Sequence, residues 1–188
     1  VINHNNTEEK QKTSEKIYTG FEYLISTDLV TKLEENHNEL SLLSSNFILL
    51  DINHNNNYNL VSDALEQILD VRMIPIISHP ERFEILNKER IFELKDKGVL
   101  FQLSLGSFSS FFGEEIEKKS KEFLETGIYD FIATDSISYD QMNNSFIENK
   151  IESVSKIIGS QKLNEIFLEN PKNVTDQKSS NDFQISRH

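Results

Sequence analysis

The residues best suited to chemistry lie in one short stretch, residues 74–83, which reads Ile-Pro-Ile-Ile-Ser-His-Pro-Glu-Arg-Phe. The run 74–77 is rich in isoleucine and predicts a buried strand, and His79 and Arg82 follow its end. Imidazole is a common ligand of transition metals, and the guanidinium fork of arginine matches the oxygens of a phosphate. The stretch therefore indicates a metal ligand and an anion clamp at one rim.

The alternative interpretation of the same stretch is a capped turn. Pro80 would end the strand and bias His79 toward an extended backbone. Glu81 and Arg82 would then lie in solvent, and single His-Pro pairs of this kind are common in loops. The stretch alone leaves both interpretations open.

The strand at 74–77 belongs to a repeating pattern of strands and helices. Strands are predicted to end near residues 50, 78, 103 and 134, each followed by a helix, after an earlier strand at 17–26. We expect helices at 28–33, from 60 to about 69 behind an N-cap at Asn59, at 88–97, at 114–126, at 147–158 and at 162–169, with Asn170-Pro171 ending the last one. This rhythm predicts a parallel α/β sheet or barrel.

Polar residues follow the predicted strands where functional sites lie in parallel α/β folds. They are Asp51, His79, Gln102 or Ser104, and Asp135. Carboxylates with an imidazole suit a divalent metal, and Arg82 would bind a phosphate. The alternative is that these residues only end strands and cap the helices that follow, which is an ordinary place for Asp135.

Composition limits the classes of partner. The chain has 188 residues, which suits one domain, and a formal net charge of −12 that disfavours nucleic acid and anionic membranes. It has no cysteine, so it forms no disulfide or thiolate site, and no apolar run is long enough to span a membrane. We expect a cytoplasmic protein with a polar tail at 1–16, one domain at 17–171 and a disordered tail at 172–188.

Other features are less specific. The segment 104–113 is rich in Gly, Ser and Phe but matches no phosphate-binding fingerprint, and we expect Phe108, Phe111 and Phe112 to pack. The remaining histidines stand in polar context and are expected to be solvated.

Several segments in the same order resemble one family. Residues 75–83 resemble the Ile-Ile-Ala-His-Pro-Glu-Arg-Tyr motif of the bacterial protein-tyrosine phosphatases encoded with capsule and exopolysaccharide genes, which belong to the polymerase and histidinol phosphatase (PHP) superfamily. Residues 20–23, Gly-Phe-Glu-Tyr, resemble Gly-Ala-Glu-Ile of that family, and 131–135, Phe-Ile-Ala-Thr-Asp, resemble its Ile-Ala-Ser-Asp. The strand at 47–52, the loop 102–113 and the closing Asn-Pro at 170–171 fall in matching places.

The resemblance implies a distorted (β/α)7 barrel with a manganese-type metal cluster that generates hydroxide to attack phosphotyrosine. By position, Glu22, Asp51, His79 and Asp135 would bind metal, and Arg82 would hold the phosphate, with Arg82 and His79 as the catalytic residues. The implied partner is a phosphotyrosine-bearing protein tail, such as that of a bacterial tyrosine kinase, and an oligomer fits the same pattern.

Departures from the family pattern affect the expected activity. Residues 1–19 carry no Asp-x-His-x-His motif, so we expect a barrel that is incomplete at its amino end. The Ser-Asp-x-His of the family becomes Thr134-Asp-Ser-Ile137, and Ile137 cannot bind metal. Two interpretations follow: a phosphatase of reduced or lost activity, or an inactive phosphotyrosine-binding or regulatory protein. A third is a different metal-dependent phosphoesterase with a similar rim.

Overall fold

A computed structural model describes residues 19–136 and 143–176 of the chain. The predicted tail at 1–16 and the part of the predicted carboxyl-terminal tail beyond residue 176 lie outside these residues, as does Ile137.

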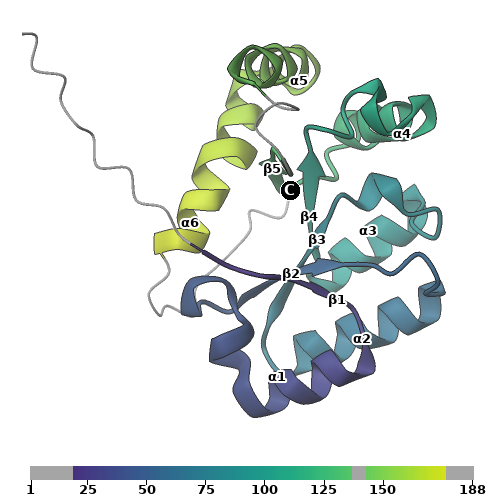
Figure 1. Ribbon diagram of the computed structural model, residues 1–188, viewed down its shortest axis with the longest axis vertical. Coiled ribbons are helices and arrows are strands. Elements are labelled where there is room, and N and C mark those ends of the chain that lie inside the picture. Colours follow the sequence, from purple (N-terminus) through teal and green to yellow (C-terminus); the bar gives the residue numbers. More distant parts are fainter. Residues whose placement is uncertain (1–18, 137–142, 177–188) are drawn as a thin grey trace, which may run out of the picture.

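Five parallel strands form one sheet in the order β1-β2-β3-β4-β5, so neighbours in the sheet are also neighbours in the chain (Figure 1). The β-branched and aromatic residues of β2 to β5 favour extended backbone, and polar residues end β2, β3 and β4. The strands are β1 (Glu22–Leu24), β2 (Phe47–Asp51), β3 (Ile74–Ser78), β4 (Leu100–Ser104) and β5 (Phe131–Ala133). The predicted strand ends are confirmed, and the parallel pairing brings them to one rim of the sheet.

A helix follows each strand. The helices are α1 (Thr27–Leu40), α2 (Tyr58–Asp70), α3 (Lys88–Lys97), α4 (Glu114–Glu125), α5 (Asn144–Asn164) and α6 (Asn170–Asp176). Short helical turns are η1 (Leu42–Ser44), η2 (Pro80–Arg82), η3 (Ser110–Phe112) and the π-helical η4 (Glu165–Glu169). As the sequence predicts, α3 ends at Gly98, whose φ of 109° is a conformation that glycine adopts easily.

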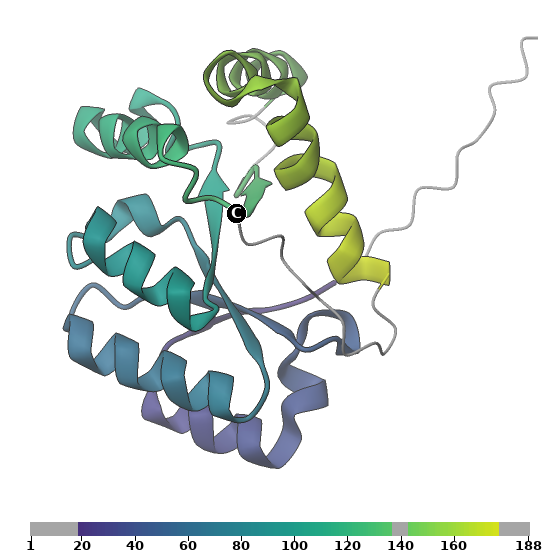
Figure 2. The same cartoon turned by 180° about the vertical axis from the view of Figure 1, so that it is seen from behind.

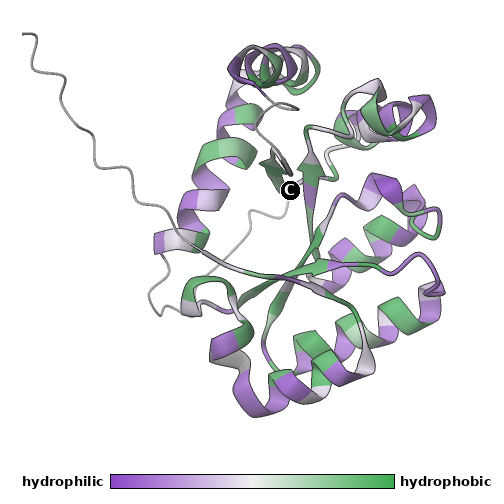
Figure 3. Ribbon diagram, viewed as in Figure 1, coloured by the Kyte–Doolittle hydropathy of each residue, from purple (hydrophilic) through white to green (hydrophobic). Residues whose placement is uncertain are grey.

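The two faces of the sheet carry separate apolar clusters. Helices α1 to α4 cover one face, and their inward sides carry the hydrophobic residues (Figures 2 and 3). On the other face Val174 of α6 packs with Phe47, Ile76, Leu100 and Phe131. A cavity of about 280 Å³ lies on this second face, below the rim.

Helix α3 has the predicted bounds 88–97, whereas α1 and α2 begin at other residues than predicted. The predicted helix at 28–33 is part of the longer α1, and the hydroxyl of Ser26 accepts a hydrogen bond from the backbone N–H of Leu29. The N-cap of α2 is Asn57, not Asn59, since its side chain accepts a bond from the N–H of Leu60. Helix α1 therefore begins one residue earlier, and α2 two residues earlier, than the apolar pattern indicates.

The prediction that Asn170-Pro171 ends the last helix is wrong, and residues 172–176, which the sequence assigns to the tail, are helical. Helical backbone continues to Asp176, because the wide π turn of η4 precedes Pro171 and accommodates a residue without an N–H. The side chain of Asn170 donates a hydrogen bond of 2.8 Å to the carbonyl of Asp130, which attaches this helix to the sheet.

The described residues therefore form an α/β fold with an open parallel sheet of five strands, and closure into a (β/α)7 barrel stays a prediction. Among the described helices, none combines the length and the apolar character needed to cross a membrane.

Candidate functional site

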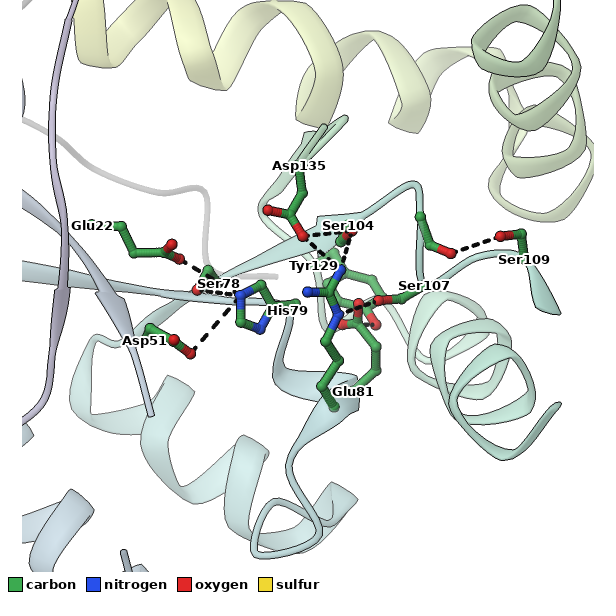
Figure 4. Close-up of polar contacts among 12 residues, drawn as sticks. Glu22, Asp51, Ser78, His79, Glu81, Ser104, Ser107, Ser109, Tyr129 and Asp135 are labelled. Atoms are coloured by element: carbon green, nitrogen blue, oxygen red, sulfur yellow. Dashed lines mark hydrogen bonds and ion pairs between the residues drawn. The ribbon is translucent and has the colours of Figure 1, made fainter. Parts of the chain in front are cut away.

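Three predicted site residues, one from each of the first three strands or the residue that follows it, lie close together (Figure 4). Glu22 lies in β1, Asp51 ends β2, and His79 directly follows β3. The Nε2 atom of His79 lies 3.7 Å from Oε1 of Glu22 and 3.9 Å from Oδ1 of Asp51. The parallel register explains why Asp51 and His79 lie together, since β2 and β3 end at the same level, whereas Glu22 begins β1 and is level with Leu49.

The backbone of His79 is left-handed, with φ of 34° and ψ of 54°. The expectation that Pro80 would hold His79 in an extended conformation is therefore wrong. The peptide N–H of His79 still bonds the carbonyl of Gln102, at 2.9 Å, and its carbonyl accepts a bond from the N–H of Arg82, so the turn η2 forms immediately after the strand. These bonds compensate for a strained backbone and direct the imidazole toward the carboxylates.

His79 is almost completely buried, with 9% of its surface exposed. Burial and the nearby positive charge of Arg82 lower its pKa, although the carboxylates of Asp135 and Glu22 act in the opposite direction. Its Nδ1 atom has no hydrogen-bond partner among the described residues, and Nε2 lies 3.2 Å from the hydroxyl of Ser78. A neutral imidazole with a free nitrogen is the form that binds metals.

Arg82 is held by three side chains on one edge of its guanidinium group. Nε donates to the hydroxyl of Ser107 at 2.8 Å, and Nη2 donates to the hydroxyl of Ser104 at 2.7 Å and to Oδ2 of Asp135 at 2.6 Å. No hydrogen bond from Nη1 to another described residue is present. Arg82 thus lies fixed at the rim, and the alternative that places it in solvent is wrong.

Asp135 lies at the same rim but contacts the arginine. Its backbone is also left-handed, with φ of 50°. Oδ2 accepts from Arg82 and, at 3.2 Å, from the hydroxyl of Ser104. The sequence predicts that Asp135 and Arg82 share one site, but it does not reveal that they bind each other.

Sequence reasoning missed the role of Glu81, which it placed in solvent in the capped-turn alternative. Only 1% of its surface is exposed, and its Oε2 atom accepts a hydrogen bond of 3.0 Å from the hydroxyl of Tyr129. Burial raises the pKa of Glu81, and the hydrogen bond from Tyr129 opposes that rise. The hydrogen bond from Tyr129 to Glu81 therefore anchors the turn that carries His79 and Arg82 to the protein interior.

The side chains at the rim match a divalent metal in type, since they offer nitrogen and oxygen donors. The observation that favours this fit is that Nε2 of buried His79 lies 3.7 and 3.9 Å from two carboxylates, whereas the unpaired nitrogen, Nδ1, is the other ring nitrogen. Within residues 19–136 and 143–176, however, no three histidine or carboxylate side chains are arranged closely enough to hold an ion. Burial also raises the pKa of Asp51. The described part of the chain thus offers an incomplete metal shell.

Comparison with known proteins identifies the class. The family model for capsular polysaccharide synthesis, CpsB/CapC, matches residues 2–176. The chain is 28% identical over 163 residues to the tyrosine-protein phosphatase CpsB of Streptococcus pneumoniae, covering 82% of this chain and 66% of that protein. It is 23% identical over 173 residues to the CpsB of Streptococcus agalactiae serotype V, covering 88% of this chain and 70% of that protein.

A solved structure supports the fold. It comes from work on YwqE from Bacillus subtilis and CpsB from Streptococcus pneumoniae, described as unique metal-dependent tyrosine phosphatases. The match has a TM-score of 0.72 at 21% identity and covers 85% of this chain and 64% of that one.

The chain therefore belongs to the CpsB/CapC family, and the predicted resemblance is confirmed. It spans just under two thirds of the length of the pneumococcal relative.

Proposed function

We propose that this chain is a phosphotyrosine-directed protein of the metal-dependent phosphatase type that serves capsule or exopolysaccharide synthesis, with reduced or lost activity. The observation that carries the proposal is the fixed guanidinium of Arg82 beside the carboxylates and the imidazole at one rim. Membership of the CpsB/CapC family supports the same conclusion.

In this proposal Arg82 binds the phosphate, and Glu22, Asp51, His79 and Asp135 are the metal ligands. A bound manganese or similar ion would supply a hydroxide for attack on phosphorus. Arg82 would hold the phosphoryl group through charge-assisted hydrogen bonds. Burial lowers the pKa of His79 and would keep its imidazole neutral, the form that binds a metal.

Reduced activity follows from the ligand set. A metal-activated water requires a complete and rigid shell of ligands. The rim supplies few donors, and Ile137 stands at the position where the family has a ligand histidine. We therefore expect weak metal binding and slow turnover.

A second candidate function is a phosphotyrosine-binding or regulatory protein without catalysis. One observation favours it: protein side chains alone hold Arg82 in place, so phosphate binding does not require a metal. The proposed partner in either case is a phosphotyrosine-bearing protein tail, for example that of a tyrosine kinase in the cytoplasm.

The two candidates separate in a paired experiment with a phosphotyrosyl peptide. Turnover is measured with added manganese, and binding is measured without it, for the wild type, His79→Ala and Arg82→Gln. The exposed Arg72, in the turn after α2, provides the matched control Arg72→Gln.

We expect binding that Arg82→Gln abolishes and Arg72→Gln preserves, with turnover slow or absent. Manganese-dependent turnover at the rate of an efficient phosphatase, lost in His79→Ala, would contradict reduced activity. Equal binding of the peptide by Arg82→Gln and the wild type would refute the role of Arg82 in phosphate binding, and with it both candidate functions.

A further inference from the structure

Two adjacent phenylalanines extend the site on the side of Arg82. The ring centroid of Phe112 lies 3.9 Å from the guanidinium carbon of Arg82, so the ring covers one face of that group. The ring of Phe111 packs edge-on against Phe112, with centroids 4.9 Å apart and planes at 82°. The prediction that Phe111 packs holds for its contact with Phe112, but 59% of its surface is exposed.

The segment that carries these rings is anchored. Phe108, three residues earlier, is buried in the core between the sheet and the helices. The hydroxyl of Ser109 donates to the carbonyl of Gly106 at 2.7 Å and accepts a bond of 3.4 Å from the N–H of Phe111. The exposure of Phe111 is thus set by the local fold and is not explained by an unattached loop.

The arrangement divides the guanidinium group into two functional surfaces. Phe112 stacks on the face, while the hydrogen bonds leave from the edge formed by Nε and Nη2. Nη1 lies outside that edge and donates to no other described residue. An oxyanion that binds at Nη1 would lie next to the Phe112 ring that stacks on the same guanidinium group. Its substituent would then be near Phe111, which contacts Phe112 and has 59% of its surface exposed.

We infer that Phe111 and Phe112 form an aromatic platform that selects phosphate monoesters of aromatic alcohols over those of aliphatic alcohols. The inference rests on the proposed function, since it requires Arg82 to bind the phosphate. The phosphate would supply the charge contact at Arg82, and the aryl ring would pack against Phe111. Phe112 positions the arginine and links the two contacts.

Binding of non-hydrolysable phosphonates tests the platform without turnover. Titration calorimetry compares phenylphosphonate with methylphosphonate, which has the same charged group but no ring. The wild type should prefer phenylphosphonate, and Phe111→Ala should lower that preference by about 2- to 12-fold, the size of one aromatic pair. Phe111→Tyr should retain it, and so should the control Phe92→Ala, which removes a ring from the exposed face of α3 (42% exposed).

Affinity for methylphosphonate separates phosphate binding by Arg82 from ring binding by Phe111. It should be the same in the wild type and Phe111→Ala, since Arg82 binds the charged group in both. If both phosphonates bind the wild type equally, or if Phe111→Ala weakens both alike, the platform is refuted and the phosphate clamp stands. If neither phosphonate binds the wild type, or if Arg82→Gln binds both as well, the clamp is refuted together with the platform.

Discussion

The ion pair between Arg82 and Asp135 leads to a prediction about phosphate affinity. Oδ2 of Asp135 accepts a hydrogen bond of 2.6 Å from Nη2 of Arg82, so a phosphate must displace this carboxylate or share the donor with it. Asp135→Asn keeps the shape of the side chain and removes its charge. The variant should therefore bind inorganic phosphate more tightly than the wild type when no metal is present.

The size of the gain follows from the strength of the bond that is lost. A hydrogen bond to a charged group contributes about 1.5–3 kcal/mol, against roughly 0.5–1.5 kcal/mol for a neutral one. The difference of about 1–1.5 kcal/mol corresponds to an affinity increase of about 5- to 12-fold. Loss of repulsion between Asp135 and the phosphate acts in the same direction.

Titration calorimetry with inorganic phosphate in metal-free buffer measures this gain. Asp51→Asn removes a charge from the same rim without touching Arg82 and should gain less, and Asp63→Asn on the exposed side of α2 should gain nothing. If Asp135→Asn binds phosphate no better than Asp51→Asn, the direct ion pair does not limit access to Arg82, and the reasoning fails.

Three further predictions concern stability and metal content. Lys95→Met leaves the buried carboxylate of Asp130 without the ammonium that contacts both of its oxygens at 2.8 Å. The free energy of unfolding measured in urea should fall by about 3–5 kcal/mol, and an unchanged midpoint would disprove the role of this pair. Burial lowers the pKa of Lys119, so between that lowered pKa and 10.5 the folded state binds fewer protons than the unfolded state. The free energy of unfolding of the wild type should therefore rise relative to that of Lys119→Met as pH rises through this window, and a difference that does not change with pH would contradict the burial effect. After purification without chelator and dialysis, elemental analysis should find less than two equivalents of manganese, iron or zinc, and two or more would show a more complete metal shell than the rim supplies.

The sequence predicts the parts of the fold that depend on local pattern. The apolar runs of β2 and β3 and the stop at Gly98 are visible in the chain because strand burial and the left-handed cap each favour particular residue types. Parallel pairing then brings His79 and Asp51 to one rim, as predicted from strand ends alone.

The contacts that complete the rim depend on tertiary structure and leave no local pattern. The pairing of Arg82 with Asp135 joins residues 53 positions apart, and the burial of Glu81 depends on Tyr129, which lies 48 positions away. The exposure of Phe111 could not be inferred either, since a phenylalanine in a Gly/Ser loop packs in one fold and faces solvent in another. Only the arrangement of the strands decides these outcomes.

The left-handed backbones of His79 and Asp135 affect the balance between stability and function. Residues other than glycine rarely adopt positive φ, and such strain costs on the order of 1–3 kcal/mol at each position. Both strained residues carry side chains of the rim, at the ends of β3 and β5. The chain is therefore less stable than its packing alone would make it, and two of the five described non-glycine residues with positive φ lie at the rim.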